Sequence, residues 1–195
     1  MQSRKAPLAP KFWPRCWLMC DARLGEPMPA IIAAMPPRSA VVVRPYAMES
    51  RGLTQMIRAI RRAARAKHHL LLLAGRGSLS GYDGRHGTAQ GGKHALITSV
   101  PVHNAVEARR ARRGHAVVVL VSPLWPTRSH PDAKGIGHAK FQQLARQSRC
   151  PAIALGGMDA ARFRLARRHG AHGWAAIDAW LPKTNRNQKR NCVPT

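Results

Sequence analysis

The stretch "HAVVVLVSPLWPTRSHPDAKGIGHAKFQQLARQSRCPAIALGGM", residues 115–158, holds two apolar runs separated by a polar loop and a segment with helical spacing. Each run is apolar at consecutive positions, which is typical of a strand buried on both faces of a sheet. We expect strands at 115–125 and 150–158, with a helix at 136–147 between them. Two such strands pair in parallel through a right-handed crossover, so the stretch predicts one unit of an α/β fold.

The same alternation of strand and helix runs through the rest of the chain. Four further helices are predicted. Two span 27–35 and 54–67, a third is capped by Asn104 and ends at Gly114, and a fourth is capped by Asp159 and ends at residue 168. Eight parallel strands favour a single small (β/α)8 TIM barrel, and no G-x-G-x-x-G follows the first strand. Residues 76–95 are too rich in glycine for a regular helix, so we expect a trimmed third and fourth βα region. The other predicted strands are 16–24, 39–47, 68–75, a weak one at 82–87, 96–103 and 171–180.

The length of 195 residues suits one domain. We expect a flexible N-terminal arm at 1–14, the barrel domain at 15–181, and a basic disordered tail at 182–195. No apolar run reaches the roughly 18 residues that cross a bilayer, and the N-terminus has no signal-peptide core, so we expect a cytoplasmic protein. The four cysteines include no C-x-x-C pair, which favours buried or spare thiols over a zinc site or a disulfide framework.

The charge is strongly basic, with 33 Lys and Arg against 8 Asp and Glu and a formal net charge of +25. Such a charge attracts polyanions non-specifically, and it also suits a protein whose ligands are phosphates. Of the 33 basic residues, 13 lie in the helical segments 58–67, 107–114 and 161–170, where we expect Arg to point outward and Ile, Ala, Leu or Phe inward. Aromatic residues, 5% of the chain, are too sparse for base-stacking platforms. Solvated helix faces are therefore favoured, with an RNA-associated protein as an alternative.

In a barrel of this kind the chemistry lies at the carboxyl ends of the strands. Gly156 and Gly157 precede the helix capped by Asp159, and glycine there lets a phosphate approach backbone N–H groups at a helix N-terminus. A tight turn is the alternative interpretation of the two glycines. The other residues expected at the strand ends are Asp21, Arg44, Ala74, Gly75, Asp83, His86, His103, residues 122–130, Ile177 and Asp178.

Several motifs, in order and spacing over about residues 41–179, resemble the thiamine phosphate synthase and TenI-like superfamily. They are "YDGRHG" (82–87), "SVPVHNAVEA" (99–108), "VLVSPLWPTRSHPDAKGIG" (119–137), "PAIALGGM" (151–158) and "GAHGWAAID" (170–178). Synthases of this superfamily join a hydroxymethylpyrimidine diphosphate to a thiazole phosphate, with Mg²⁺ on the diphosphate. The resemblance therefore implies small phosphorylated substrates and a transferase of thiamine biosynthesis.

The resemblance also implies roles for individual residues. Arg44 would contact the diphosphate as a permanent cation. Thr127 and Ser129 would donate hydroxyl hydrogen bonds to phosphate, and His130 stands where the family has a lysine. The thiazole phosphate would be held by Gly156, Gly157 and the amides near Ile177 and Asp178.

The chain departs from the family where the metal is bound. The family has Asn-Asp after the third strand, where this chain has Ala74 and Gly75, and no acid follows at residues 88–90. Magnesium needs hard oxygen ligands, usually one or two carboxylates beside the substrate phosphates. Mg²⁺ is thus expected from the family while its usual ligands are absent. Asp83 is the one candidate replacement ligand, although its family counterpart is structural.

Three functions stay open on the sequence. The first is a divergent synthase in which a cationic rim partly replaces the metal. The second is a TenI-type protein, either a thiazole tautomerase with His103 as general base or a non-catalytic ligand-binding paralogue. The third is non-enzymatic, either a degenerate barrel that retains affinity for phosphate or an RNA-associated protein, and homo-oligomerisation is also left open. The rim residues of the first function are Arg44, Arg85, Lys93, Arg128 and His130.

Overall fold

Eight parallel strands close into a barrel in the computed structural model, which describes residues 13–48, 51–87, 97–114, 116–127 and 134–181. Each strand pairs with its neighbours in sequence, and β1 pairs with β8 to close the sheet. The predicted (β/α)8 fold is confirmed. The strands are β1 (Cys16–Met19), β2 (Ala40–Val43), β3 (Leu70–Ala74), β4 (Gly84–His86), β5 (Thr98–Val102), β6 (Val118–Val121), β7 (Ala152–Leu155) and β8 (Gly173–Ala176).

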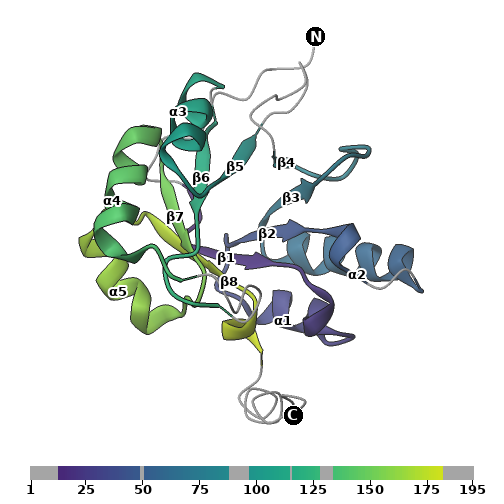
Figure 1. Cartoon of the computed structure of the whole chain (residues 1–195). Helices are drawn as coiled ribbons and strands as arrows, with labels where there is room; N and C mark the ends of the chain where they lie inside the picture. The colour runs from purple at the N-terminus through teal and green to yellow at the C-terminus, as the bar shows by residue number, and fades with distance from the viewer. Residues whose placement is uncertain (1–12, 49–50, 88–96, 115, 128–133, 182–195) are drawn as a thin grey trace, which may run out of the picture.

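The helices cover the barrel unevenly. Figure 1 shows α3, α4 and α5 along one side of the barrel and α1 and α2 along another. Between β3 and β4 every residue is described and none is helical, which confirms the trimming of the third βα unit; residues 88–96, between β4 and β5, lie outside the described residues. None of the described helices is long and apolar enough to span a bilayer. The α-helices are α1 (Met28–Ala34), α2 (Leu53–Ala66), α3 (Ala105–Arg113), α4 (Gly137–Ser148) and α5 (Ala160–Arg168); short 3₁₀ turns are η2 (Ala22–Leu24), η3 (Pro45–Ala47) and η4 (Asp178–Trp180).

Five strands end at least three residues earlier than the apolar pattern predicts. The strands expected at 115–125, 150–158 and 171–180 end at Val121, Leu155 and Ala176, and the other two have a clear local cause. The strand expected at 16–24 ends at Met19, because the Asp21 side chain accepts a hydrogen bond from the Arg23 amide and caps η2. The strand expected at 39–47 ends at Val43, because Pro45 has no amide hydrogen for the sheet and begins η3. Both early endings place polar side chains at the mouth of the barrel.

The barrel interior is filled by alternate residues of the strands. Trp17 and Met19 from β1 pack there with Val42, Leu72 and Leu120 from β2, β3 and β6. The other strand faces pack against the helices in two further clusters. Alternation of inward and outward residues is what a closed eight-stranded barrel requires.

The boundary of the barrel differs from the prediction at its N-terminal end. The predicted arm runs to residue 14, whereas Trp13 is only 5% exposed and packs in the interior cluster. Its neighbour Pro14 accepts a 2.8 Å hydrogen bond from Trp17 Nε1. At the other end of the described residues Leu181 is buried. Residues 1–12 and 182–195 lie outside the described residues, so the predicted arm and tail stay predictions there.

The helix caps follow the sequence closely. Asn104 Oδ1 accepts from the Glu107 amide at 3.0 Å, and Asp159 Oδ1 accepts from the Arg162 amide at 2.8 Å, which confirms both predicted caps. The inward orientation expected of the apolar helix residues is wrong at three exposed positions, Ala66, Ala161 and Leu165, of which Leu165 is the largest. Leu165 is 43% exposed, because Phe163 and Ala166 form the inward face of α5.

The cysteines behave as interior side chains. Burial raises the pKa of the Cys20 thiol to about 12 and that of Cys150 to about 11. Burial also raises the pKa of the Cys16 thiol, against smaller opposing effects of Trp174 and Arg15. Cys192 lies outside the described residues. These three thiols are therefore protonated and poorly nucleophilic at neutral pH.

Gly84 should be required for the pairing of β4. A β-carbon there would press on the Ile97 carbonyl oxygen and lie 2.7 Å from the Ile97 β-carbon. We expect Gly84→Ala to lower the free energy of unfolding by about 2–3 kcal/mol, measured by urea denaturation followed by circular dichroism. Gly114→Ala is the control, because Gly114 has φ −81°, which any residue adopts. Equal losses in the two variants would contradict the prediction.

Candidate functional site

Arg44 lies at the carboxyl end of β2 and is held by two groups that follow β1. Its Nε donates to the Cys20 carbonyl oxygen at 2.9 Å, and its Nη2 lies 2.8 Å from Asp21 Oδ2. The side chains of Arg44 and Asp21 are both 19% exposed. The guanidinium is thus fixed at the mouth of the barrel while part of it stays open to solvent.

The ion pair continues across the mouth to β8. Asp21 Oδ1 also lies 2.9 Å from Arg23 Nε, and Arg23 Nη1 lies 3.3 Å from Asp178 Oδ1. Arg44, Asp21, Arg23 and Asp178 therefore form a chain of alternating charges, which we call the rim network. Burial acts to raise the pKa of Asp21, but hydrogen bonds from Arg23 and the charges of Arg23 and Arg44 outweigh it and lower that pKa. Asp21 is accordingly ionised and both arginines are held in place.

The sequence predicts only part of the rim network. Arg44, Asp21 and Asp178 are expected at strand ends from the apolar pattern, whereas Arg23 is not. The sequence does carry a local signal for Arg23. Asp21 directly follows an apolar run, and an Asp that caps a turn there accepts a hydrogen bond from the amide two residues later, which is that of Arg23. The pairing of Arg23 with Asp178 links residues 155 positions apart and has no local signal.

His86 ends β4 and is almost fully buried, with 8% exposure. Its Nδ1 lies 2.9 Å from the Ser99 hydroxyl of β5. Burial, with a smaller contribution from the positive charge of Arg44, lowers the pKa of His86 to about 4. The imidazole is therefore neutral at pH 7.

The loop after β3 is organised by an arginine. The Arg85 guanidinium donates to the carbonyl oxygen of Gly75, and its Nη2 donates to that of Gly77 at 2.8 Å. Tyr46 lies beside the same loop, since a β-carbon on Gly75 would be 3.6 Å from the Tyr46 ring. The Arg85 guanidinium thus lies beside Gly75, one of the two residues at which the family resemblance implies a metal-binding carboxylate.

Asp83 does not lie at this end of the barrel. Its Oδ2 accepts a 2.8 Å hydrogen bond from the Leu71 amide, near the start of β3. The expectation that Asp83 follows a strand is wrong, because β4 begins after Asp83 and ends at His86. The Asp83 carboxylate therefore stabilises the sheet at the amino-terminal ends of its strands, away from Arg44. Within the part of the chain that the structure describes, no three His, Cys, Asp or Glu side chains are grouped to hold a metal ion.

Gly156 and Gly157 allow two loops of the barrel mouth to touch. The Leu124 amide donates to the Leu155 carbonyl oxygen at 2.8 Å, and the Trp125 amide donates to that of Gly156 at 3.2 Å. The glycines have φ +96° and +61°, and a β-carbon on either would lie within 2.8 Å of the loop after β6. Close backbone approach thus requires glycine here whether or not a phosphate binds.

A cation stands beside this pair of loops. Arg162, in the first turn of α5, donates from Nη1 to the Gly157 carbonyl oxygen, and its guanidinium lies 5.4 Å from the centre of the Trp125 ring. Thr127 closes the described part of the loop after β6. Ser129 and His130, with Arg128, lie outside the described residues, so their predicted roles stay predictions.

His103 follows β5 and is tied to the start of α3. Its Nδ1 lies 2.9 Å from Glu107 Oε2, which also accepts from the His103 amide at 2.7 Å. Burial acts to raise the pKa of Glu107, but the hydrogen bonds and charge of His103, with Asn104, lower it below its usual range. The imidazole is 52% exposed and its orientation is set by an ionised carboxylate. This combination suits a general base and equally suits a helix cap.

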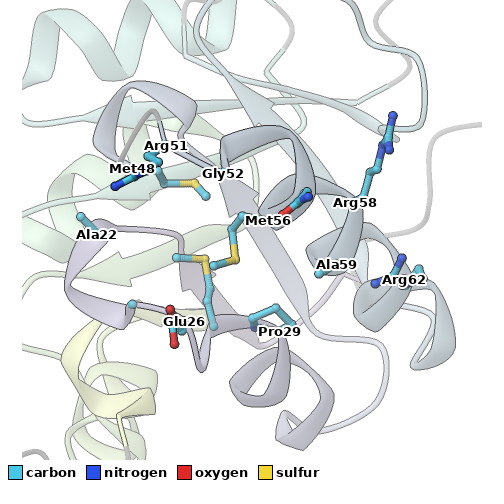
Figure 2. Close-up of a pocket in the computed structure, with 13 residues that line it drawn as sticks. Ala22, Glu26, Pro29, Met48, Arg51, Gly52, Met56, Arg58, Ala59 and Arg62 are labelled. Carbon is cyan, nitrogen blue, oxygen red and sulfur yellow. The ribbon is translucent and has the colours of Figure 1, made fainter.

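A large groove of about 820 Å³ lies elsewhere, between α1 and α2. Figure 2 shows Met56 extending into the groove and Arg58 pointing away from it. Met28, Met48 and Arg51 also line it. Arg44, His86 and the glycines after β7 do not line it, but Ala22 of the loop after β1 and Met48 of the loop after β2 do, so this groove borders the barrel mouth.

Comparison of the sequence with protein families finds one match that covers most of the barrel. The model of the family described as thiamine monophosphate synthase matches residues 30–180. A putative thiamine-phosphate synthase 2 from Aquifex aeolicus is 29% identical over 86 residues, 44% of this chain and 46% of that protein. The thiamine-phosphate synthase of Geobacillus thermodenitrificans is 36% identical over 85 residues, 43% of this chain and 38% of that protein. The matched stretches therefore span less than half the length of these relatives.

Solved structures extend the likeness over the whole barrel. A thiamine phosphate pyrophosphorylase from Pyrococcus furiosus superposes with a TM-score of 0.72 and 19% identity, covering 91% of this chain and 92% of that one. An HpcH/HpaI aldolase from Desulfitobacterium hafniense superposes with a TM-score of 0.60 and 12% identity, covering 94% and 95%. At these identities the likeness establishes the fold, which chemically different enzymes share.

His86 should make the stability depend on pH. The unfolded imidazole takes up a proton below about pH 6.5, whereas the folded one does so only near pH 4. The contribution of His86 to the free energy of unfolding is therefore fully present above about pH 6.5. It is lost as the pH falls to about 4, which lowers the free energy of unfolding by about 3 kcal/mol in total. We expect His86→Gln, which can still bond to Ser99, to flatten the pH dependence of the urea midpoint in this window. An unchanged slope in His86→Gln would contradict the assignment.

Proposed function

Because the chain belongs to the thiamine monophosphate synthase family, we propose that it couples a hydroxymethylpyrimidine diphosphate to a thiazole phosphate and releases pyrophosphate. The observation that carries the proposal is the fixed position of Arg44 at the carboxyl end of β2. That end of a (β/α)8 barrel is where such enzymes bind their substrates. A cation held in advance by Cys20 and Asp21 needs no rearrangement when a diphosphate arrives.

The reaction needs charge stabilisation more than proton transfer. The bond between the pyrimidine methylene carbon and the diphosphate oxygen breaks, and its electron pair leaves with pyrophosphate. The lone pair of the thiazole nitrogen then forms the new carbon–nitrogen bond, which leaves a thiazolium cation. Arg44 would stabilise the negative charge that develops on the leaving group.

The thiazole phosphate is assigned to the loops after β6, β7 and β8. The contacts of Leu124 and Trp125 with the β7 loop bring Gly156 and Gly157 beside the segment that leads to Thr127. In this proposal Thr127, Ser129 and His130 donate to phosphate oxygens, together with amides of the glycines and near Ile177. The Asp178 carboxylate, which would repel an anion, is balanced by its ion pair with Arg23.

A synthase assay with both substrates tests the proposal. We expect the wild-type chain to form thiamine phosphate and Arg44→Gln to lose turnover about 100-fold or more, because a stabiliser of the leaving group is removed. Arg112→Gln, which removes the same charge from an exposed position on α3, should retain wild-type turnover. No product from the wild-type chain, while it still binds thiazole phosphate, would instead identify a non-catalytic binding protein. Equal losses in the two variants would contradict the role of Arg44.

The hydrogen bond between His103 and Glu107 favours a second candidate, a thiazole tautomerase. Isomerisation of the thiazole phosphate is a proton transfer, and an imidazole oriented by a carboxylate can act as its general base.

Tautomerase turnover of the wild-type chain and of His103→Gln tests this second candidate. We expect a loss of about 100-fold or more in the variant if His103 is the base. His68→Asn, at an exposed position before β3, is the control. Tautomerase turnover that survives in His103→Gln would exclude His103 as the base.

A further inference from the structure

The groove between α1 and α2, which we call the α1–α2 groove, has an apolar floor. Met28 is 2% exposed and belongs to the core cluster that also contains Ile32 of α1 and Ile60 of α2. Met48 and Met56 pack against the same cluster and stay partly exposed, and Met56 extends into the groove (Figure 2). Methionine side chains are flexible and polarisable, so they adapt to apolar groups of different shapes. The floor can therefore pack against apolar side chains of another molecule.

Positive charges flank this floor. In Figure 2 Arg51 lies on one side of Met48 and Met56, and Arg62 lies on the other. Arg51 precedes Gly52, the N-cap of α2, and Arg62 is in the third turn of that helix, so their backbones are roughly 15 Å apart along it. No described carboxylate pairs with either guanidinium. Among the described residues that line the groove, the basic ones are Arg51, Arg58 and Arg62 and the acidic one is Glu26.

The chain itself offers few carboxylates to this basic rim. Of its eight acidic residues the structure describes six, and five of these are bonded within the molecule. Residues 1–12 and 182–195 contain basic residues and no Asp or Glu. A second copy, with a net charge of +25, would be repelled. The occupant is therefore another molecule that carries negative charge. The bonded carboxylates are Asp21, Asp83, Glu107, Asp159 and Asp178.

The same bonds bear on the Mg²⁺ that the family implies at the diphosphate, because the described residues do not fit it. Magnesium binds through one or two carboxylates with the substrate phosphates. At the mouth the described carboxylates are Asp21 and Asp178, and each has a guanidinium nitrogen within 3.3 Å. No step of the proposed reaction is therefore assigned to the ion.

An acidic amphipathic helix matches the α1–α2 groove in shape and in chemistry. Helices bind grooves of this kind through apolar side chains at positions i, i+3, i+4 and i+7. About 10 helical residues span the roughly 15 Å between Arg51 and Arg62, so carboxylates on such a helix can reach both. Single-stranded nucleic acid binds through aromatic platforms, and no aromatic residue is among the described residues that line the groove.

We propose that the α1–α2 groove binds an acidic amphipathic helix of another protein. Its apolar side chains pack on Met28, Met48 and Met56, and its carboxylates pair with Arg51 and Arg62. Because the groove borders the barrel mouth, the partner lies beside the rim network. The groove residues take no part in the proposed synthase reaction, so this inference stands apart from the proposed function.

Fluorescence anisotropy with a labelled synthetic peptide tests the proposal. The peptide has about 14 residues, with Leu at positions i, i+3, i+4 and i+7 and Glu on the opposite face. A second peptide has the same composition in an order that forms no apolar face. At about 150 mM salt we expect the full chain to bind the amphipathic peptide at least about 10-fold more tightly than the second one. Equal affinity for the two peptides would mean charge attraction alone and would overturn the proposal.

Variants locate the binding in the groove. Ala59→Glu places a carboxylate on the α2 side of the groove, and Met56→Gln makes the floor polar with little change in volume. Each should bind the amphipathic peptide about 10-fold or more weakly, through charge repulsion in the first and loss of apolar contact in the second. Ala139→Glu makes the same charge change at an exposed position of α4 and should alter the affinity less than about twofold. Met56→Gln also covers the case in which Ala59→Glu does not fold. If Ala59→Glu and Ala139→Glu weaken binding equally, the groove is not the binding site.

Two other occupants have outcomes of their own. A single-stranded oligonucleotide that binds the full chain as tightly as the peptide, and is released by Ala59→Glu, would assign the groove to nucleic acid. A chain that sediments as a dimer, and as a monomer after Ala59→Glu, would assign it to a second copy. Either result would contradict the proposal.

Discussion

The barrel depends on how one large side chain fits inside a closed sheet. Trp17 of β1 is fully buried in the interior, and its register partners on both sides are alanines, Ala40 of β2 and Ala175 of β8. The interior of an eight-stranded barrel is just wide enough for packed side chains, so an indole leaves room only for small neighbours. The Trp17 carbonyl oxygen also accepts a 3.0 Å hydrogen bond from Trp180 Nε1, which fastens η4 where β8 meets β1.

Closure of β1 onto β8 also completes the rim network. Asp21, Arg23 and Arg44 meet through the pairing of β1 with β2, whereas Arg23 meets Asp178 after β8 only because the first and last strands are neighbours. The network uses acidic residues in a chain that has few of them, and it uses them to hold arginines. In a protein of net charge +25, positive charge is abundant, and these carboxylates fix the position of two of the charges. Positioning the two arginines is therefore the role of the carboxylates at the mouth.

Motifs that act through the backbone can be recognised in the sequence alone. The caps at Asn104 and Asp159, the weak strand at residues 84–86 and the missing third helix all follow from local hydrogen bonding or from glycine content. The position of Asp83 cannot be recognised in this way. It stands next to a strand in the sequence, and only the extent of β4 decides whether it precedes or follows that strand. Leu165 is mispredicted for a similar reason, because the inward face of a helix is set by its neighbours.

The sequence by itself determined the order of strands and helices, the (β/α)8 barrel, the family resemblance and the absence of the family's metal-binding carboxylates, because each of these depends on local pattern or on residue identity. The tertiary structure decided which charges meet. Arg23 and Asp178 are 155 positions apart, and the Arg85 side chain reaches a loop that follows another strand. Contacts of this kind depend on strand register and on the closure of the sheet, and no local pattern in the chain encodes them.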